Sequence, residues 1–223
     1  MSLSIHKFTY PGLDVTRIRS GRLRQNAYVV RRHAFDDVLI IDPGACGAEL
    51  LDVLNQFEIP PTDIFLTHAH YDHLVSLCEI LDKFDIPVWM HPAEKKLLKY
   101  APLYALRFEG LDIKVPEDFR AIEGNENALL VRGIKVLHTP GHTAGGVSFD
   151  LQGACFTGDT LMRERAGNVD PIVGDAASLR RSIDVIIGSI GDECVLLSGH
   201  GDAWTGFEAK TWLTLNRDKI EFC

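Results

Sequence analysis

Three histidines and an aspartate lie within six residues of the sequence, in the stretch FLTHAHYDHLVS. Imidazole and carboxylate groups are ligands for borderline divalent ions such as zinc. In an extended or tightly turned segment, His68 and His70 point to the same side, whereas Asp72 and His73 diverge. We therefore expect this one short loop to supply ligands to two neighbouring ions.

Three later segments each place one such side chain where a strand is expected to stop. They are HTPGHTAGG with His142, FTGDTL with Asp159 and LLSGHGD with His200. Small glycines flank each of these residues, which lets backbone approach a crowded site. A single histidine or aspartate would be read as an ordinary surface or turn residue. Four segments with the same placement favour a metal centre instead.

The remaining histidines and the cysteines carry weaker signals. His6, His33, His91 and His138 stand alone and are expected to be surface or core residues, although a supporting role stays open for His91 and His138. The cysteines are five in number, scattered singly and without a C-x-x-C pair: Cys46, Cys78, Cys155, Cys194 and Cys223. This pattern argues against a disulfide framework or a zinc knuckle.

Composition excludes several classes of function. The chain has 223 residues, 46% of them hydrophobic and 24% charged, and a net charge of −8. No run of lysine and arginine is present, so no nucleic-acid partner is expected. The N-terminus lacks a secretory signal pattern and no stretch is long enough to span a membrane, which predicts a cytoplasmic protein without a membrane partner. The oligomeric state is not readable from these features.

The elements that must position the ligands alternate along the chain. Strands are expected over 15–18, 27–31, 37–42, 63–68, 86–91, 128–133, 134–141, 145–151, 154–161 and 193–201. Helices are expected over 48–57, 73–84, 92–100, 179–190 and 207–217. The aromatic-bearing segment from Tyr100 to Phe119 is expected to be irregular, either a lid over the site or an apolar patch at a sheet edge. Two similar alternations without a linker predict an α/β (α+β) chain that forms two sheets covered by helices.

The motifs THAHYDH, TPGHTAGG, FTGDTL and SGHG, in this order, resemble the metallo-β-lactamase superfamily. The resemblance extends from Arg17 to Lys219 and includes Asn26-Ala-Tyr and Ile41-Asp-Pro-Gly. It implies a four-layer αββα sandwich and a single domain over residues 1–223. It also implies two divalent metal ions, for which zinc is expected and iron or manganese stays open.

The resemblance assigns each ligand by position. It implies that His68, His70 and His142 hold the first metal, that Asp72, His73 and His200 hold the second, and that Asp159 bridges the two. Asp72 and Asp159 are the expected catalytic residues, because they would position a metal-bridging hydroxide that attacks an acyl carbon.

Within the superfamily, the sequence is most similar to the glyoxalase II group of thioester hydrolases. Antibiotic-hydrolysing members generally have cysteine or serine where this chain has Asp159, and redox-active diiron members have glutamate where it has His70. The segment from Gly167 to Asp175 matches the group's G-R-x-D-x-x-x-G-D pattern, except that Asn168 replaces arginine. Val75-Ser76 also replaces a usual glycine pair, and the 23 residues after His200 are too few for a C-terminal helical domain that grips glutathione.

The expected function is therefore hydrolysis of a small-molecule thioester or related acyl bond. Three alternatives stay open: a mononuclear iron persulfide dioxygenase, a lactonase or phosphodiesterase variant of the hydrolase, and a non-catalytic or signal-responsive protein that retains the site.

Overall fold

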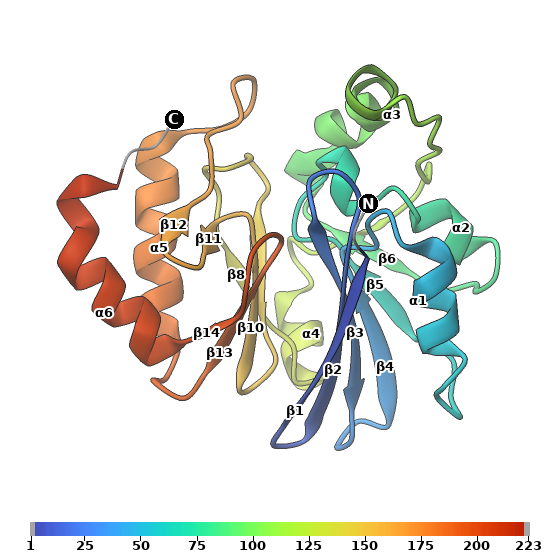
Figure 1. Ribbon diagram of the computed structural model, residues 1–223, viewed down its shortest axis with the longest axis horizontal. Coiled ribbons are helices and arrows are strands. Elements are labelled where there is room, and N and C mark those ends of the chain that lie inside the picture. The colour runs from blue at the N-terminus through green and yellow to red at the C-terminus, as the bar shows by residue number, and fades with distance from the viewer. Residues whose placement is uncertain (1–2, 221–223) are drawn as a thin grey trace. The chain divides into compact units, whose positions relative to one another are not determined.

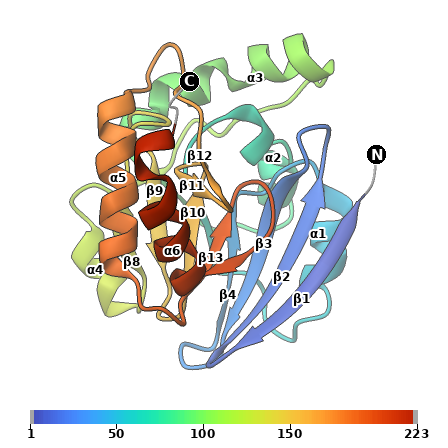
Figure 2. The same cartoon turned by 60° about the vertical axis from the view of Figure 1, so that its left-hand side comes forward.

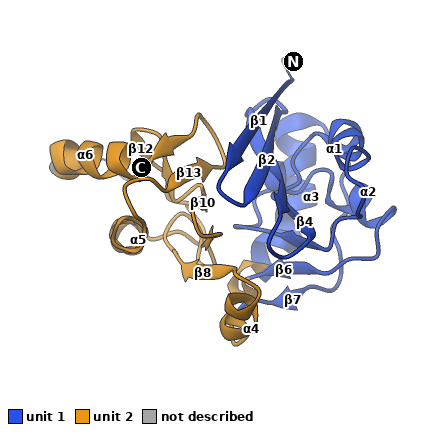
Figure 3. Ribbon diagram, turned by 90° about the horizontal axis from the view of Figure 1, so that it is seen from below, with its two compact units in different colours: residues 1–90, 95–122 blue, residues 91–94, 123–223 orange. Residues whose placement is uncertain are grey.

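The computed structural model describes residues 3–220 (Figure 1). The chain divides into two compact units, drawn in different colours in Figure 3. Unit 1 comprises residues 1–90 and 95–122, and unit 2 comprises residues 91–94 and 123–223. The single domain over residues 1–223 stays a prediction.

Unit 1 is built on a seven-stranded sheet. Strands β1 to β4 are antiparallel neighbours, and β4 to β7 run parallel. The five predicted strands of this half correspond to β2 to β6. The edge strand β1 was not predicted, because most of its residues are exposed and it lacks a clear apolar face. In sheet order the strands are β1 Ser4–Tyr10, β2 Leu13–Ser20, β3 Gln25–Arg32, β4 Asp37–Ile41, β5 Asp63–Phe65, β6 Val88–Met90 and β7 Arg120–Ala121.

The helices of unit 1 differ from the prediction at two places. The helix expected over 73–84 is shorter: the 3₁₀ turn η1 (Tyr71–His73) comes first, and α2 spans only Leu77–Leu81. The segment from Tyr100 to Phe119 is irregular only in its second half, since α3 runs from Lys95 to Glu109 and the irregular stretch begins at Gly110. A buried stripe of Leu97, Leu98, Ala101 and Ala105 stabilises this longer helix by packing against the unit. The expected first helix is α1 (Gly47–Leu54).

Unit 2 contains a five-stranded sheet in the order β14-β13-β10-β9-β8 and a small two-stranded sheet of β11 and β12. The expected strand over 128–133 is wrong: these residues belong largely to helix α4 (Glu126–Val131). Leu129 is buried, whereas its neighbours Leu130 and Val131 are exposed. Only one side of the helix is therefore buried, although the run is apolar throughout. The strands are β8 Lys135–His138, β9 Val147–Asp150, β10 Ala154–Gly158, β11 Leu161–Met162, β12 Arg165–Ala166, β13 Val195–Ser198 and β14 Trp204–Thr205.

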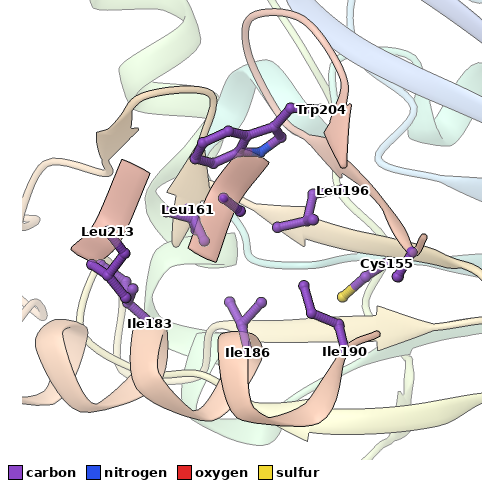
Figure 4. Packing of buried hydrophobic residues seen from close by; sticks show 10 residues of the cluster. Cys155, Leu161, Ile183, Ile186, Ile190, Leu196, Trp204 and Leu213 are labelled. Atoms are coloured by element: carbon purple, nitrogen blue, oxygen red, sulfur yellow. The ribbon is translucent and has the colours of Figure 1, made fainter. Parts of the chain in front are cut away.

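Helices α5 (Ala176–Ser189) and α6 (Gly206–Asn216) lie side by side in unit 2 (Figure 2). Their buried side chains form a core cluster with strands β10 and β13, and Figure 4 shows Ile183, Ile186 and Leu213 directed into it. The short 3₁₀ turns η2 (Pro92–Glu94) and η3 (Arg217–Lys219) complete the unit. Within residues 3–220, no helix has the length and apolar character needed to cross a membrane.

Candidate metal centre

Unit 1 gathers four of the predicted ligands on the loop that follows β5. The Nε2 atom of His68 lies 3.1 Å from Nδ1 of His70, and Nε2 of His73 lies 3.8 Å from a carboxylate oxygen of Asp72. His68, Asp72 and His73 are buried and His70 is half-buried. We call these four residues the loop half-site.

The buried carboxylate of Asp42 holds this loop in place. Asp42 follows β4 and accepts hydrogen bonds from the backbone N–H of Thr67 (2.7 Å) and from its hydroxyl (2.6 Å). It also contacts Nδ1 of His73 at 2.9 Å. Asp42 adopts a positive φ of 50°, a backbone conformation that is uncommon for residues with a side chain.

These contacts determine which nitrogen of each imidazole ring carries the proton and which carries the lone pair that could bind a metal ion. His73 donates its Nδ1–H to Asp42, which leaves Nε2 as an acceptor. Thr67 gives its only hydroxyl proton to Asp42, so its oxygen accepts the Nδ1–H of His68 at 3.0 Å. A carboxylate or hydroxyl behind the imidazole is the arrangement that fixes metal-ligating histidines in proteins.

Unit 2 gathers the other three predicted ligands, which come from three separate strand ends. Asp159 lies between two histidines: its Oδ2 atom is 3.8 Å from Nε2 of His142 and 3.4 Å from Nε2 of His200. His142 and Asp159 are largely buried, and His200 is half-buried. We call these three residues the strand-end half-site.

Backbone groups position the strand-end half-site. The Nδ1–H of His142 donates to the carbonyl oxygen of Asn168 at 2.5 Å, and the backbone N–H of Asp170 donates to the carbonyl of His142 at 2.9 Å. The hydroxyl of Ser198 donates to the carbonyl of His200 at 2.6 Å. Gly167 is required for this packing, because a Cβ atom there would lie 1.7 Å from the carbonyl oxygen of Asp159.

The sequence prediction did not single out the residues that support the predicted ligands, among them Asp42 and Asn168. Asp42 belongs to the Ile41-Asp-Pro-Gly match, which was a usable signal, but its role depends on pairing with a loop 25 residues away. Asn168 acts through its backbone carbonyl, so no side-chain pattern could reveal it. Its side chain, which departs from the expected arginine, is not needed for this contact.

The unusual Val75-Ser76 pair has a local explanation. Ser76 is buried and accepts the backbone N–H of Cys46 at 3.2 Å, while its own N–H donates to the carbonyl of Pro43 at 3.1 Å. These bonds tie the end of the ligand loop to the turn after β4. Val75 lines a small cavity together with Tyr71 and Asp72.

The other singled-out residues lie outside both half-sites. His91 and His138 stack on each other in unit 2 with ring centroids 4.4 Å apart. Four cysteines are free thiols, and burial raises the pKa of Cys46 to about 12, so it does not behave as a nucleophile at neutral pH. Cys223 lies outside the described residues.

The donor atoms of both half-sites are of the kinds that divalent metal ions bind. The loop half-site offers three imidazoles and a carboxylate, and the strand-end half-site offers two imidazoles and a carboxylate. In His68, His73 and His142 the nitrogen that would bind a metal is set by a hydrogen bond at the other ring nitrogen.

Comparison with known proteins points to one family. A family profile described as "Metallo-beta-lactamase superfamily" matches residues 20–200. "Probable metallo-hydrolase YqgX" of Bacillus subtilis (strain 168) is 33% identical over 189 residues, covering 83% of this chain and 89% of the relative. "Hydroxyacylglutathione hydrolase GloC" of Haemophilus influenzae is 29% identical over 171 residues, covering 74% and 81%.

A solved structure gives the same result for the fold. The crystal structure of TTHA1623 in a di-iron-bound form superposes with a TM-score of 0.78 at 32% identity and covers 87% of this chain and 96% of that one. These likenesses confirm the predicted fold class, a metallo-β-lactamase-like sandwich of sheets and helices.

Proposed function

Because the chain belongs to the metallo-β-lactamase superfamily and to its hydrolases, we propose that it hydrolyses thioesters with the help of two bound divalent ions. The superfamily fold binds divalent metals, and one similar protein has been crystallised with two iron ions. The substrate in this proposal is a small acyl thioester, and zinc is the expected metal, with iron and manganese as the other candidates.

In this proposal the seven predicted ligands act as one centre. The first ion is held by His68, His70 and His142. The second is held by Asp72, His73 and His200, and Asp159 serves both. The hydrogen-bonded rings of the loop half-site support this assignment, as does the position of Asp159 between two histidines.

When bound, the ions supply Lewis acidity and lower the pKa of a coordinated water to about 7. The chain's own carboxylates then orient the attacking water. Asp72 and Asp159 both have oxygens next to imidazole nitrogens and are acceptors for its proton. Asp42 and the Asn168 carbonyl keep His73 and His142 in one tautomer, so the ligand nitrogens are preorganised.

The observation that carries the proposal is the carboxylate at position 159, flanked at 3.8 Å and 3.4 Å by His142 and His200. A carboxylate here, together with an imidazole at position 70, is the combination that resembles the thioester-hydrolysing group. The likeness to the hydroxyacylglutathione hydrolase GloC agrees with that choice.

A thioester assay on Asp159→Asn tests the proposal. We expect purified protein with its native metals to hydrolyse acyl thioesters, and the variant to lose at least a hundredfold in kcat/KM because the shared carboxylate is gone. Oxygen uptake with a persulfide substrate is measured in parallel. Full thioesterase activity in the variant would contradict the proposal, as would oxygen consumption without thioester hydrolysis.

A further inference from the structure

Four aromatic rings form a continuous ladder in unit 1, leading away from the loop half-site. Tyr71 stacks on Phe108 with centroids 6.3 Å apart, Phe108 contacts Tyr104 at 6.0 Å, and Tyr104 contacts Tyr100 at 6.2 Å. Tyr71 directly precedes the predicted ligand Asp72, so one end of the ladder lies at the loop half-site. The other three rings are spaced four residues apart on α3, which places them along one helical face.

The three rings on α3 are more exposed than the ring at the loop half-site. Tyr71 is 9% exposed, whereas Phe108 is 58% exposed, Tyr104 is half-buried and Tyr100 is 43% exposed. Helical rise places Tyr100 and Phe108 roughly 12 Å apart along α3. Exposed aromatic rings in a row are unusual on a surface that binds nothing, because each leaves a large apolar area in water.

The ladder is fixed at its inner end. α3 packs against η1 in unit 1. The Tyr71 hydroxyl lies 3.5 Å from Oε1 of Glu109, and the guanidinium of Arg22 lies 3.4 Å from the carbonyl oxygen of Phe108. The rings are thus a prearranged surface and not a loose cluster.

The charge of α3 is opposite to that of the whole chain. The helix carries four cationic side chains against the single carboxylate of Glu109, although the chain as a whole has a net charge of −8. The cations Lys96, Lys99 and Arg107 are exposed, and helical geometry places Lys96 and Arg107 on the face that carries Tyr100 and Tyr104. Aromatic rings interleaved with cations on one face are suited to a ligand that is both aromatic and anionic.

We propose that this face of α3 binds the nucleotide end of a thioester whose thiol carrier is of the coenzyme A type. The purine ring would stack on Tyr100 and Tyr104, the phosphates would pair with Lys96, Lys99 and Arg107, and the long thiol arm would follow the ladder to Tyr71. The proposal rests on the proposed thioesterase function and specifies its substrate class. A glutathione thioester has no ring to stack on this face.

A pair of matched substrates isolates the contribution of the nucleotide. Acetyl-coenzyme A and S-acetylpantetheine share the acyl group, the thioester and the thiol arm, and differ in the nucleotide. We expect kcat/KM to be at least tenfold higher for acetyl-coenzyme A, mainly through a lower KM, since one base–aromatic stack accounts for roughly that factor. Added salt is expected to reduce the ratio because phosphate pairing is screened.

Variants of exposed residues test which side chains cause the preference. Tyr100→Leu combined with Tyr104→Leu, and separately Lys96→Glu combined with Lys99→Glu, are each expected to reduce the kcat/KM ratio about tenfold. Lys83→Glu combined with Lys7→Glu changes the charge of unit 1 by the same amount away from α3 and is expected to leave the ratio unchanged. Phe207→Leu, which alters an exposed ring of unit 2, is the control for the aromatic variant.

Binding of adenosine 3′,5′-bisphosphate, measured by calorimetry on the protein with and without its metals, gives a readout independent of turnover. We expect binding in both states and its loss in the tyrosine and lysine variants. Equal kcat/KM for the two acetyl thioesters would overturn this inference and leave the thioesterase proposal standing. Bisphosphate binding without hydrolysis of any thioester would overturn the proposed function alone, and absence of binding would overturn the nucleotide site.

Discussion

The two half-sites hold similar side chains by different means. In the loop half-site, the four predicted ligands come from six consecutive residues, and the buried carboxylate of Asp42 holds His73 and Thr67 in place. In the strand-end half-site, the three predicted ligands come from positions 142, 159 and 200, and the carbonyl of Asn168, the hydroxyl of Ser198 and the close approach at Gly167 support them. The comparison teaches that a local cluster can be anchored by a carboxylate from a distant strand end, whereas a dispersed set relies more on close packing of the backbone.

The largest effect is expected from a substitution that disrupts the backbone packing of the strand-end half-site. Gly167→Ala would place a Cβ atom 1.7 Å from the carbonyl of Asp159, and neither backbone can give way cheaply. We expect the free energy of unfolding to fall by about 3 kcal/mol or more, at the upper end for overpacking. Bound metal should fall as well, measured by urea denaturation and elemental analysis.

Gly188→Ala in α5 is the matched control, because its added Cβ meets no atom within 4 Å. Replacing glycine by alanine inside a helix is expected to stabilise by about 0.5–1 kcal/mol. A Gly167→Ala protein with native stability and native metal content would show that the backbone does not define this half-site.

The next largest effect concerns the anchor of the loop half-site. Asp42→Asn keeps the shape of the side chain but removes the charge that accepts from Thr67 and His73. We expect metal affinity to fall ten- to a hundredfold, as for other groups that support a ligating histidine. Competition with a chromogenic chelator measures it.

Asp63→Asn provides the comparison for that measurement. Asp63 is also a buried carboxylate of unit 1, and it accepts a hydrogen bond from Nε1 of Trp89 in β6. Its variant should lose stability without losing metal affinity. If both variants weakened metal binding equally, Asp42 would have no special role as an anchor.

A smaller effect separates stability from metal binding within unit 2. Thr205 caps α6 in a reciprocal capping box with Glu208. Thr205→Ala should lower the free energy of unfolding by about 1 kcal/mol. Metal affinity should not change, because α6 carries no ligand. Thr214→Ala, near the other end of the same helix, is the control and should leave the free energy of unfolding nearly unchanged. A loss of metal affinity in Thr205→Ala would contradict this expectation and show that α6 supports the strand-end half-site.

The smallest expected effect is a pH dependence at the start of α5. Hydrogen bonds from Ser178 lower the pKa of Asp175, whose backbone N–H also donates to the carbonyl of Gly141. A lowered folded-state pKa means that the contribution to stability is present above the unfolded pKa of about 3.9 and is lost as pH falls through the folded value. The difference in urea midpoint between the native protein and Asp175→Asn should therefore shrink from pH 6 to pH 3. A difference that stayed constant with pH would show that the charge of Asp175 does not contribute to stability.

Sequence reasoning could propose a set of ligands, which stays a prediction, because the chemistry is carried by side chains at strand ends. The loop motif is contiguous, and His142, Asp159 and His200 each stand beside glycines after an apolar run. It also reached most strands of both sheets. It failed where an apolar run has only one buried residue, as at Leu129 in α4, and where a proline-containing segment forms a helix through its buried stripe, as in α3.

The supporting interactions could not be predicted for a physical reason. Asp42 becomes an anchor only because β4 and β5 pair in parallel, and that pairing is a tertiary event. The position of the Asn168 carbonyl and the close approach at Gly167 depend on the path of the backbone, which residue type alone does not predict.

Metal titration of the metal-free protein, followed by thioester hydrolysis, tests the central claim most directly. The account predicts that hydrolysis rises until about two equivalents of divalent ion per chain are bound, and that Asp159→Asn does not reach this activity. Full activity at one equivalent, or no hydrolysis of any thioester at two, would contradict it.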